Sequence, residues 1–143
     1  MKAITVNCEN IEISNNKNIC LIAGPCQLES EQHEWIWLGK IKEITTKINI
    51  GFIYKTSFDK ANRTSLKGIR GAGLDKSLPV FDKIKKDLQV PILTDIHSAE
   101  QCSIVSSHVD VLQIPAFLCR QTDLLVAAAK TNKIINVKKG QFL

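Results

Sequence analysis

The chain has 143 residues, of which 44% are hydrophobic and 23% charged, and its formal net charge is +5. This composition is typical of a globular domain and excludes a disordered or fibrous chain. No apolar stretch is long enough to cross a bilayer, and the first residues lack the apolar core of a secretory signal, so we expect a cytoplasmic protein. The positive charge indicates an anionic partner, which could be nucleic acid, membrane lipid or a phosphorylated metabolite.

Turn residues and hydrophobic periodicity predict the elements in chain order. Residues 3–13 alternate apolar and polar side chains and meet an Asn-rich turn, which predicts a hairpin within residues 1–18. Ser30 can cap a first helix. The apolar face of that helix would hold Trp35, Leu38, Ile41, Ile44 and Ile48. The remaining apolar runs predict five buried strands alternating with helices. The strands are expected at 19–23, 51–55, 91–97, 109–115 and 134–138, and the helices at 30–48, 77–88, 99–106 and 121–131.

The alternation of strands and helices predicts an α/β fold of parallel βαβ units, either in a (β/α)8 barrel (the TIM barrel) or in an open doubly wound sheet. The chain contains neither a GxGxxG fingerprint nor a Walker loop, which favours the barrel. Five strands do not close such a barrel, and no helix follows the fifth. We therefore expect residues 19–143 to form the first half of a (β/α)8 barrel, and the chain to be truncated.

Cationic side chains follow the predicted strands at their carboxyl ends, where a barrel of parallel strands places its active site. Because side chains alternate along a strand, Lys55 shares a face with Ile53 and would point into the barrel, and Lys138 shares a face with Asn136. Lysines on two strand ends would meet at one small volume, which suits a phosphate or a carboxylate. A solvated basic loop is the alternative for residues 55–65.

Polar residues on two further strand ends could complete this site. Asp95 could order a hydroxylated substrate, or serve as the partner that makes buried lysines tolerable. Gln113 would offer an amide donor at the end of its strand, and His97 could contribute from the face that Asp95 shares. Arg120 precedes the last helix and could bind a phosphate through two N–H groups, or lie on the surface.

Five cysteines, an odd number without CxxC spacing, argue against a disulfide framework and a self-contained zinc module. Most of them are expected to be reduced and buried. Cys26 differs, because Gly24 and Pro25 end the first barrel strand just before it and place it at the mouth of the barrel. As a thiolate it could bind a divalent metal, with histidine and carboxylate ligands from elsewhere.

Five segments of the chain form long motifs in a fixed order. They read CLIAGPCQLES (20–30), YKTSFDKANRTSLKGIRGAG (54–73), LTDIH (93–97), LQIPAFLCRQTDL (112–124) and NVKKGQF (136–142). Together they resemble the amino-terminal half of the 3-deoxy-D-manno-octulosonate 8-phosphate synthases, also called 2-dehydro-3-deoxyphosphooctonate aldolases. The resemblance implies a (β/α)8 barrel, usually a homotetramer, that acts in the cytoplasm on the route to the Kdo sugar of lipopolysaccharide.

The resemblance also implies roles for individual residues. Positions that bind phosphoenolpyruvate are matched by Lys55, Lys60, Gln113 and Lys138. Positions that receive arabinose 5-phosphate are matched by Asn62, Arg63 and Thr64. Phe117 and Arg120 match positions that approach a neighbouring subunit's site and help to bind the sugar phosphate there, with Arg120 near the phosphate. Asp95 matches a polar active-site position, and we expect it to act in catalysis with Lys60 and Lys138. Cys26 matches a ligand of the metal-dependent members, which implies a divalent metal ion as cofactor.

The implied reaction joins C3 of phosphoenolpyruvate to the aldehyde carbon of arabinose 5-phosphate while water adds to C2, and the resulting hemiketal phosphate releases inorganic phosphate. The lysines, Arg63 and a metal would hold the two anions and stabilise developing charge. In the family the other metal ligands (a His, a Glu and an Asp) lie in a second half that this sequence lacks. We therefore expect the chain alone to be inactive and poorly folded, with exposed sheet edges.

Three alternatives remain open at this point. A related synthase joins phosphoenolpyruvate to erythrose 4-phosphate, although the KANRTS segment at 60–65 argues against it. The chain could instead be a non-catalytic remnant of a degraded gene. Nucleic-acid binding would need a continuous basic face with aromatic platforms, whereas the cations here follow strand ends. We therefore expect small anionic substrates, and neither a nucleic acid nor a membrane, as partners.

Overall fold

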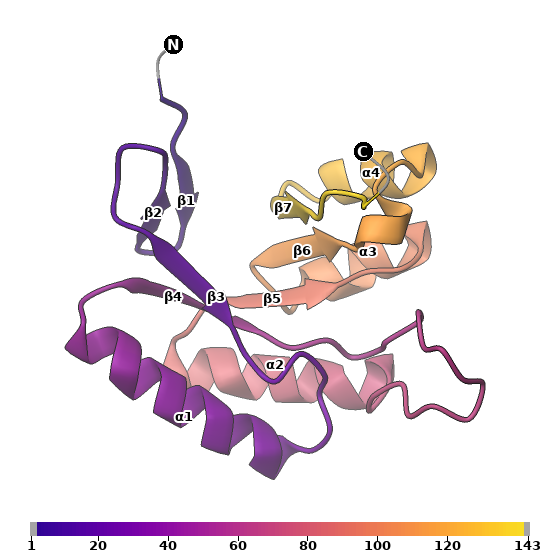
Figure 1. Cartoon of the computed structure of the whole chain (residues 1–143), viewed down its shortest axis with the longest axis horizontal. Helices are drawn as coiled ribbons and strands as arrows, with labels where there is room; N and C mark the ends of the chain where they lie inside the picture. The colour runs from indigo at the N-terminus through magenta and orange to yellow at the C-terminus, as the bar shows by residue number, and fades with distance from the viewer. Residues whose placement is uncertain (1–2, 142–143) are drawn as a thin grey trace.

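The computed structural model describes residues 3–141, which form a small hairpin and a five-stranded parallel sheet with helices (Figure 1). The hairpin consists of β1 (Val6–Cys8) and β2 (Ile11–Ile13). The parallel sheet consists of β3 (Cys20–Ala23), β4 (Gly51–Lys55), β5 (Ile92–Asp95), β6 (Val111–Ile114) and β7 (Ile134–Val137). The helices are α1 (Glu31–Lys47), α2 (Leu74–Leu88), α3 (Ala99–Ser106), the short 3-10 helix η1 (Ala116–Leu118) and α4 (Thr122–Ala129).

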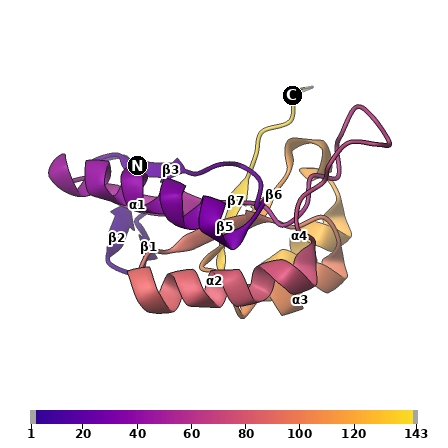
Figure 2. The ribbon, with the colours of Figure 1, turned by 90° about the horizontal axis from the view of Figure 1, so that it is seen from below.

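Each strand of the larger sheet pairs in parallel with the next strand of the chain, in the order β3-β4-β5-β6-β7. A helix separates each strand from the next, and the sheet curls between β3 and β7 (Figures 1 and 2). An open doubly wound sheet would reverse its strand order at a switch point, and this sheet does not. The predicted fold, the first part of a (β/α)8 barrel preceded by a hairpin, is therefore confirmed.

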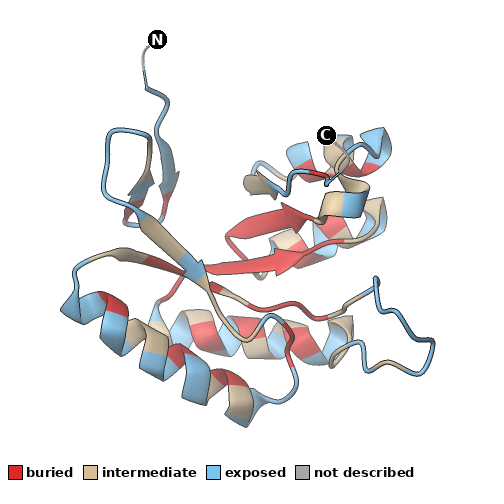
Figure 3. Cartoon of the chain, viewed as in Figure 1, coloured by how far each residue is buried: buried red, intermediate tan, exposed pale blue. Residues whose placement is uncertain are grey.

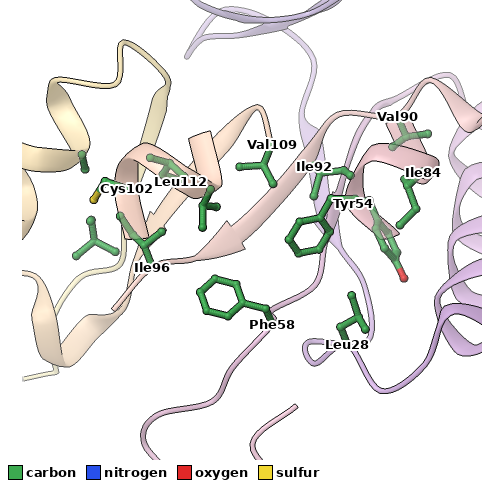
Figure 4. Close-up of a cluster of buried hydrophobic side chains, with 14 of the residues drawn as sticks. Leu28, Tyr54, Phe58, Ile84, Val90, Ile92, Ile96, Cys102, Val109 and Leu112 are labelled. Atoms are coloured by element: carbon green, nitrogen blue, oxygen red, sulfur yellow. The ribbon is translucent and has the colours of Figure 1, made fainter. Parts of the chain in front are cut away.

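The main core lies between the outer face of the sheet and the helices. Alternate strand residues such as Tyr54, Ile92 and Leu112 point to this side and are fully buried (Figure 4). The central strands β5 and β6 are buried along their whole length (Figure 3). The prediction that the 19–23 strand is buried was wrong, since β3 lies at the sheet edge and is only half-buried.

The inner face of the sheet carries a second, smaller apolar cluster. Ile53, Leu93 and Val111 form it with Cys8 and Ile11 of the hairpin. The hairpin packs against the start of β4, where a Cβ on Gly51 would lie only 2.8 Å from a methyl carbon of Ile11. The hairpin therefore covers the amino ends of the strands and leaves their carboxyl ends open.

Two of the predicted helices need correction. The predicted apolar face of α1 was wrong in its second half, because Ile44 and Ile48 are 58% and 60% exposed. The buried side instead includes Glu34 and Thr45, polar residues that hydrogen bonds make tolerable in a core. Helix α2 begins at Leu74 rather than at 77, and Ser77 lies inside its first turn.

None of the helices within residues 3–141 is long and apolar enough to cross a membrane.

Candidate functional site

Polar side chains occupy the inner face of the sheet at the carboxyl ends of its strands. The parallel register places Asp95 of β5 beside Gln113 of β6, and Gln113 beside Asn136 of β7. The Asn136 amide donates to Gln113 Oε1 at 2.8 Å, and the Gln113 amide donates in turn to Asp95 Oδ1. Three strand ends are thereby joined by a hydrogen-bonded row that ends on a carboxylate.

Asp95 is the centre of this row. Its Oδ2 accepts a hydrogen bond from Ser57 Oγ at 2.8 Å and pairs with the Lys60 ammonium at 3.1 Å. Lys60 also donates to Ser57 Oγ at 2.8 Å. Burial favours a higher pKa for Asp95, but the hydrogen bonds from Gln113 and Ser57, together with the charges of Lys60 and Lys55, hold the pKa below its ordinary value. Asp95 is therefore a charged group at neutral pH, and it fixes the direction of Lys60.

A cavity of about 350 Å³ opens beside this pair. Its polar lining comes from Lys60, Asn62, Asp95, His97, Lys138 and Gln141, and its apolar lining includes Phe117. Lys138 follows β7, and its backbone N–H bonds to the Ile114 carbonyl at 3.0 Å, which continues the sheet for one more residue. Two cations, Lys60 from the loop after β4 and Lys138 from the end of β7, therefore line one small volume. The alternation of side chains predicted Lys55 in the place that Lys60 takes.

His97 forms part of the cavity wall. Its ring packs edge-on against Phe58, with 5.7 Å between the ring centroids, and its backbone N–H donates to Gln101 Oε1 at 2.7 Å. Burial lowers the pKa of His97 below its ordinary value of 6.5. A neutral imidazole at this place can accept or donate a hydrogen bond toward the cavity without adding to its positive charge.

Cys26 lies at the turn that follows β3, next to the end of β4. The Lys55 ammonium lies 3.4 Å from Cys26 Sγ, and the Ser57 N–H donates to the Cys26 carbonyl at 3.2 Å. The two chain segments approach so closely that a Cβ on Gly24 would lie 1.9 Å from the Lys55 carbonyl oxygen, so only glycine fits there. Lys55 thus contacts Cys26 and is not among the residues that line the cavity.

The donor set around Cys26 does not make a complete metal site. Within residues 3–141 there is no group of three or more His, Cys, Asp and Glu side chains that could hold a metal ion. All five cysteines are free. The prediction that most of them are buried was wrong, because only Cys8 and Cys102 are buried, Cys20 and Cys119 are half-buried and Cys26 is exposed.

The long loop between β4 and α2 is folded back on itself. The Lys60 N–H donates to the Arg70 carbonyl at 2.7 Å, and the Arg70 guanidinium pairs with Asp59. Arg63 donates from Nε to the Ile69 carbonyl at 2.9 Å. Asn62, Arg63 and Thr64 are all exposed at the tip, and Asn62 reaches the cavity.

The last two predicted site residues, Phe117 and Arg120, differ in whether they line the cavity. Phe117 of η1 lines the cavity, whereas Arg120 is exposed and is not among the lining residues. The sequence analysis missed Ser57, although it lies two residues beyond Lys55 in a segment where every second side chain faces inward. It also missed Gln27, which is only 9% exposed and accepts a hydrogen bond from Arg63.

Comparisons with known proteins assign the family of the chain. A family model described as the DAHP synthetase I family matches residues 3–143. A protein of Mesorhizobium japonicum named 2-dehydro-3-deoxyphosphooctonate aldolase is 62% identical over 139 residues, which cover 97% of this chain and 50% of that protein. Proteins of the same name from a Chelativorans species and from Brucella ovis are 64% identical over 130 residues and 60% identical over 139 residues. They cover 91% and 97% of this chain, and 47% and 50% of those proteins. The chain thus spans about half the length of the curated relatives it matches, and it belongs to the DAHP synthetase I family.

Proposed function

We propose that this chain carries the substrate-binding face of an enzyme that condenses phosphoenolpyruvate with D-arabinose 5-phosphate and water. The products are 3-deoxy-D-manno-octulosonate 8-phosphate and inorganic phosphate. The observation that carries the proposal is the cavity at the carboxyl ends of the strands, which is lined by Lys60, Lys138 and the buried Asp95 carboxylate that Lys60 contacts. The shared printed name of the relatives, 2-dehydro-3-deoxyphosphooctonate aldolase, supports it.

The chemistry of the cavity suits phosphoenolpyruvate, a compact molecule with a phosphate and a carboxylate. Lys60 and Lys138 supply two positive charges against one negative charge from Asp95, so the polar lining favours anions. Since Lys60 is largely shielded from water, with only 16% of its side chain exposed, its attraction to an anion is less screened than on an open surface. Asp95 holds the Lys60 ammonium in place before the substrate arrives, which is the preorganisation that catalysis of this kind requires.

The sugar phosphate would bind at the tip of the loop between β4 and α2. Asn62 lines the cavity, and Arg63 and Thr64 follow it directly, so a sugar with its aldehyde beside phosphoenolpyruvate could extend its phosphate toward Arg63. An arginine binds a phosphate through two parallel N–H groups, which fixes the orientation of the sugar as well as its position.

A chimera tests this proposal. In the chimera, this chain replaces the matching half of the Mesorhizobium japonicum relative, and the release of inorganic phosphate from phosphoenolpyruvate is measured with each sugar phosphate in turn. We expect turnover with arabinose 5-phosphate and little or none with erythrose 4-phosphate. Turnover with erythrose 4-phosphate alone would assign the chain to the related synthase, and no turnover with either sugar would support a non-catalytic remnant.

We also propose a divalent metal ion as cofactor, with Cys26 as one ligand. Because the residues in the structure offer no complete ligand set, the other ligands would come from outside residues 3–141. Cys26 suits the role, since its thiol is exposed at the carboxyl end of β3. The metal would supply a Lewis acid.

The assembly and cellular context proposed here follow from the same assignment. We propose a homotetramer in which Phe117 and Arg120, both exposed near the cavity, meet a neighbouring subunit. The route to the Kdo sugar of lipopolysaccharide, in the cytoplasm, would be its context.

A further inference from the structure

Two arginines in the loop between β4 and α2 are held by the same edge of the guanidinium group. Arg63 donates from Nε to the Ile69 carbonyl at 2.9 Å and from Nη2 to Gln27 Oε1. Arg70 donates from Nε to Asp59 Oδ1 at 2.7 Å and from Nη2 to Asp59 Oδ2. In both residues Nε–H and one Nη2 proton, which together form the side edge of the guanidinium, donate to these acceptors. The end edge, formed by Nη1 and the second Nη2 proton, points away from them.

The acceptors of the two arginines differ in charge. Arg70 meets a carboxylate; hydrogen bonding to Asp59 raises the pKa of Arg70, and the same contact lowers the pKa of Asp59. Arg63 meets two neutral oxygens, a side-chain amide and a peptide carbonyl. Its contacts therefore fix the guanidinium without compensating its charge. Arg70 therefore links two parts of the loop through its ion pair with Asp59. The positive charge of Arg63 is not neutralised by its two acceptors and can attract another anion.

Gln27 is well placed to fix Arg63, because its backbone belongs to the rigid turn beside the site. The Ser57 N–H donates to the carbonyl of Cys26, the preceding residue, and the N–H of Leu28, the following residue, donates to the Ser57 carbonyl at 2.9 Å. The Gln27 side chain is only 9% exposed, so its amide is anchored inside the protein while Arg63 is exposed at the loop tip.

We infer that Gln27 is a positioning residue for phosphate binding. It holds the side edge of Arg63 through a neutral oxygen, so that the end edge is presented, with its charge intact, to a phosphate monoester. Two parallel N–H groups on one edge match two phosphate oxygens, and a guanidinium fixed in advance loses less side-chain freedom on binding. Identifying this phosphate as that of arabinose 5-phosphate rests on the proposed function; the positioning by Gln27 does not.

The Gln27→Glu substitution separates the positioning of Arg63 from its charge. Gln27→Glu keeps the length of the side chain and the accepting oxygen, but it would give Arg63 the carboxylate partner that Arg70 already has. Gln27→Met keeps the approximate volume and removes the acceptor. Lys67→Gln is the matched control, since it lowers the net charge by one unit, as Gln27→Glu does, at an exposed residue that shares the loop of Arg63 but lies outside the Arg63 contacts.

The experiment follows the Arg63 Nε–H group by two-dimensional 1H–15N NMR of this chain within the chimera described above, with the signal assigned through its loss in Arg63→Lys. Inorganic phosphate is titrated first. In the unmodified chain we expect a saturable shift of this signal. In Gln27→Met the signal should move toward that of a free arginine before phosphate is added, and phosphate affinity should fall about tenfold, which corresponds to one charge-assisted hydrogen bond. In Gln27→Glu the ligand-free signal should stay hydrogen-bonded while the affinity falls by a similar factor, and in Lys67→Gln the affinity should change less than about twofold.

Two results would overturn the inference. An unchanged Arg63 signal and affinity in Gln27→Met would show that Gln27 does not position Arg63, and phosphate binding by Gln27→Glu as tight as in the unmodified chain would show that a neutral acceptor is not needed. A separate titration with arabinose 5-phosphate distinguishes the sources of the phosphate. If the sugar phosphate binds no more tightly than inorganic phosphate, the proposed function loses support while the role of Gln27 stands.

Discussion

The Lys60 ammonium lies 3.1 Å from Asp95 Oδ2, although the lysine belongs to the loop after β4 and the aspartate ends β5. The pair is largely shielded from water, with side chains 16% and 9% exposed. Ser57 joins both partners, and Gln113 holds the other carboxylate oxygen. This contact attaches the loop after β4, which carries Lys60, to the end of β5. The candidate site therefore depends on the same contact that holds the loop against the sheet.

Removing the carboxylate should therefore destabilise the fold as well as the site. We expect Asp95→Ala to lower the free energy of unfolding by about 3 kcal/mol, because it leaves a shielded ammonium and two hydrogen-bond donors without their acceptor. Urea denaturation of the chimera that joins this chain to the second half of its relative checks this value, and the same chimera serves the unfolding measurements below. Asp87→Asn, at an exposed position on α2, is the control and should change the free energy by less than about 0.5 kcal/mol. Equal effects of the two substitutions would mean that the Asp95 contacts add little to stability.

Glu34 offers a second prediction, on the opposite face of β4. It is fully buried in α1, and the Tyr54 hydroxyl donates to its Oε2 at 3.0 Å. Burial raises the pKa of Glu34 above its ordinary value of 4.5. The folded chain therefore retains a proton that the unfolded chain releases, so the contribution of Glu34 to stability decreases as the pH rises above about 4.5.

Glu34→Gln should remove this dependence, because the amide keeps the acceptor for Tyr54 and cannot ionise. We expect the variant to be more stable than the unmodified chain at neutral and alkaline pH, with the difference shrinking toward pH 4. Unfolding free energies measured across this range test it. A variant that is less stable at every pH would show that the carboxylate is held in its charged form.

The lowered pKa of His97 makes folding less favourable in mild acid. Burial lowers it below 6.5, so the unfolded chain takes up a proton near that pH and the folded chain does so only at lower pH. Stability should therefore decrease as the pH falls below about 6.5, and this decrease should be smaller in His97→Gln. The measurement compares unfolding free energies near neutral pH and about one unit below 6.5, above the range in which Asp95 titrates. The same loss in both proteins would place His97 in a solvated setting.

The sequence predicted the fold, and which polar residues of two strands share the inner face of the sheet, from rules that act over short distances. Alternation along a strand placed Asp95 and Gln113 on the inner face with Lys55, and the strand ends brought them to one edge. The sequence could not assign partners between strands. The pairing of Asp95 with Lys60, rather than with a substrate, depends on how the loop after β4 folds back.

The errors also have physical causes. Hydrophobic periodicity assigned Ile44 to the core and left Glu34 out of it, because a buried carboxyl group is tolerated only through a hydroxyl, that of Tyr54, that lies 20 residues away in the sequence. Likewise, Gln27 follows Cys26 without any local signal of its role. Its partner, Arg63, lies 36 residues further along the chain.

Metal removal tests the role of Cys26 in the chimera of this chain with the second half of its relative. Treatment with a chelator should abolish turnover, and a divalent metal should restore it. Cys26→Ala should reduce the bound metal, measured by elemental analysis of the purified protein, whereas Cys119→Ala should retain it. Full metal content in the Cys26→Ala protein would exclude Cys26 as a ligand.

The most direct test of the central claim compares two adjacent lysines in the same chimera. Lys138 lines the cavity, whereas Lys139 follows it in the chain and is not among the lining residues. We predict that Lys138→Ala lowers kcat/KM for phosphoenolpyruvate by at least about a hundredfold, the scale expected when a charged contact to a reacting anion is lost, while the far-ultraviolet circular dichroism of the protein is retained. Lys139→Ala should stay within a few-fold of the unmodified chimera. Unchanged kcat/KM in Lys138→Ala, or equal losses in both variants, would contradict a phosphoenolpyruvate site at the carboxyl ends of these strands.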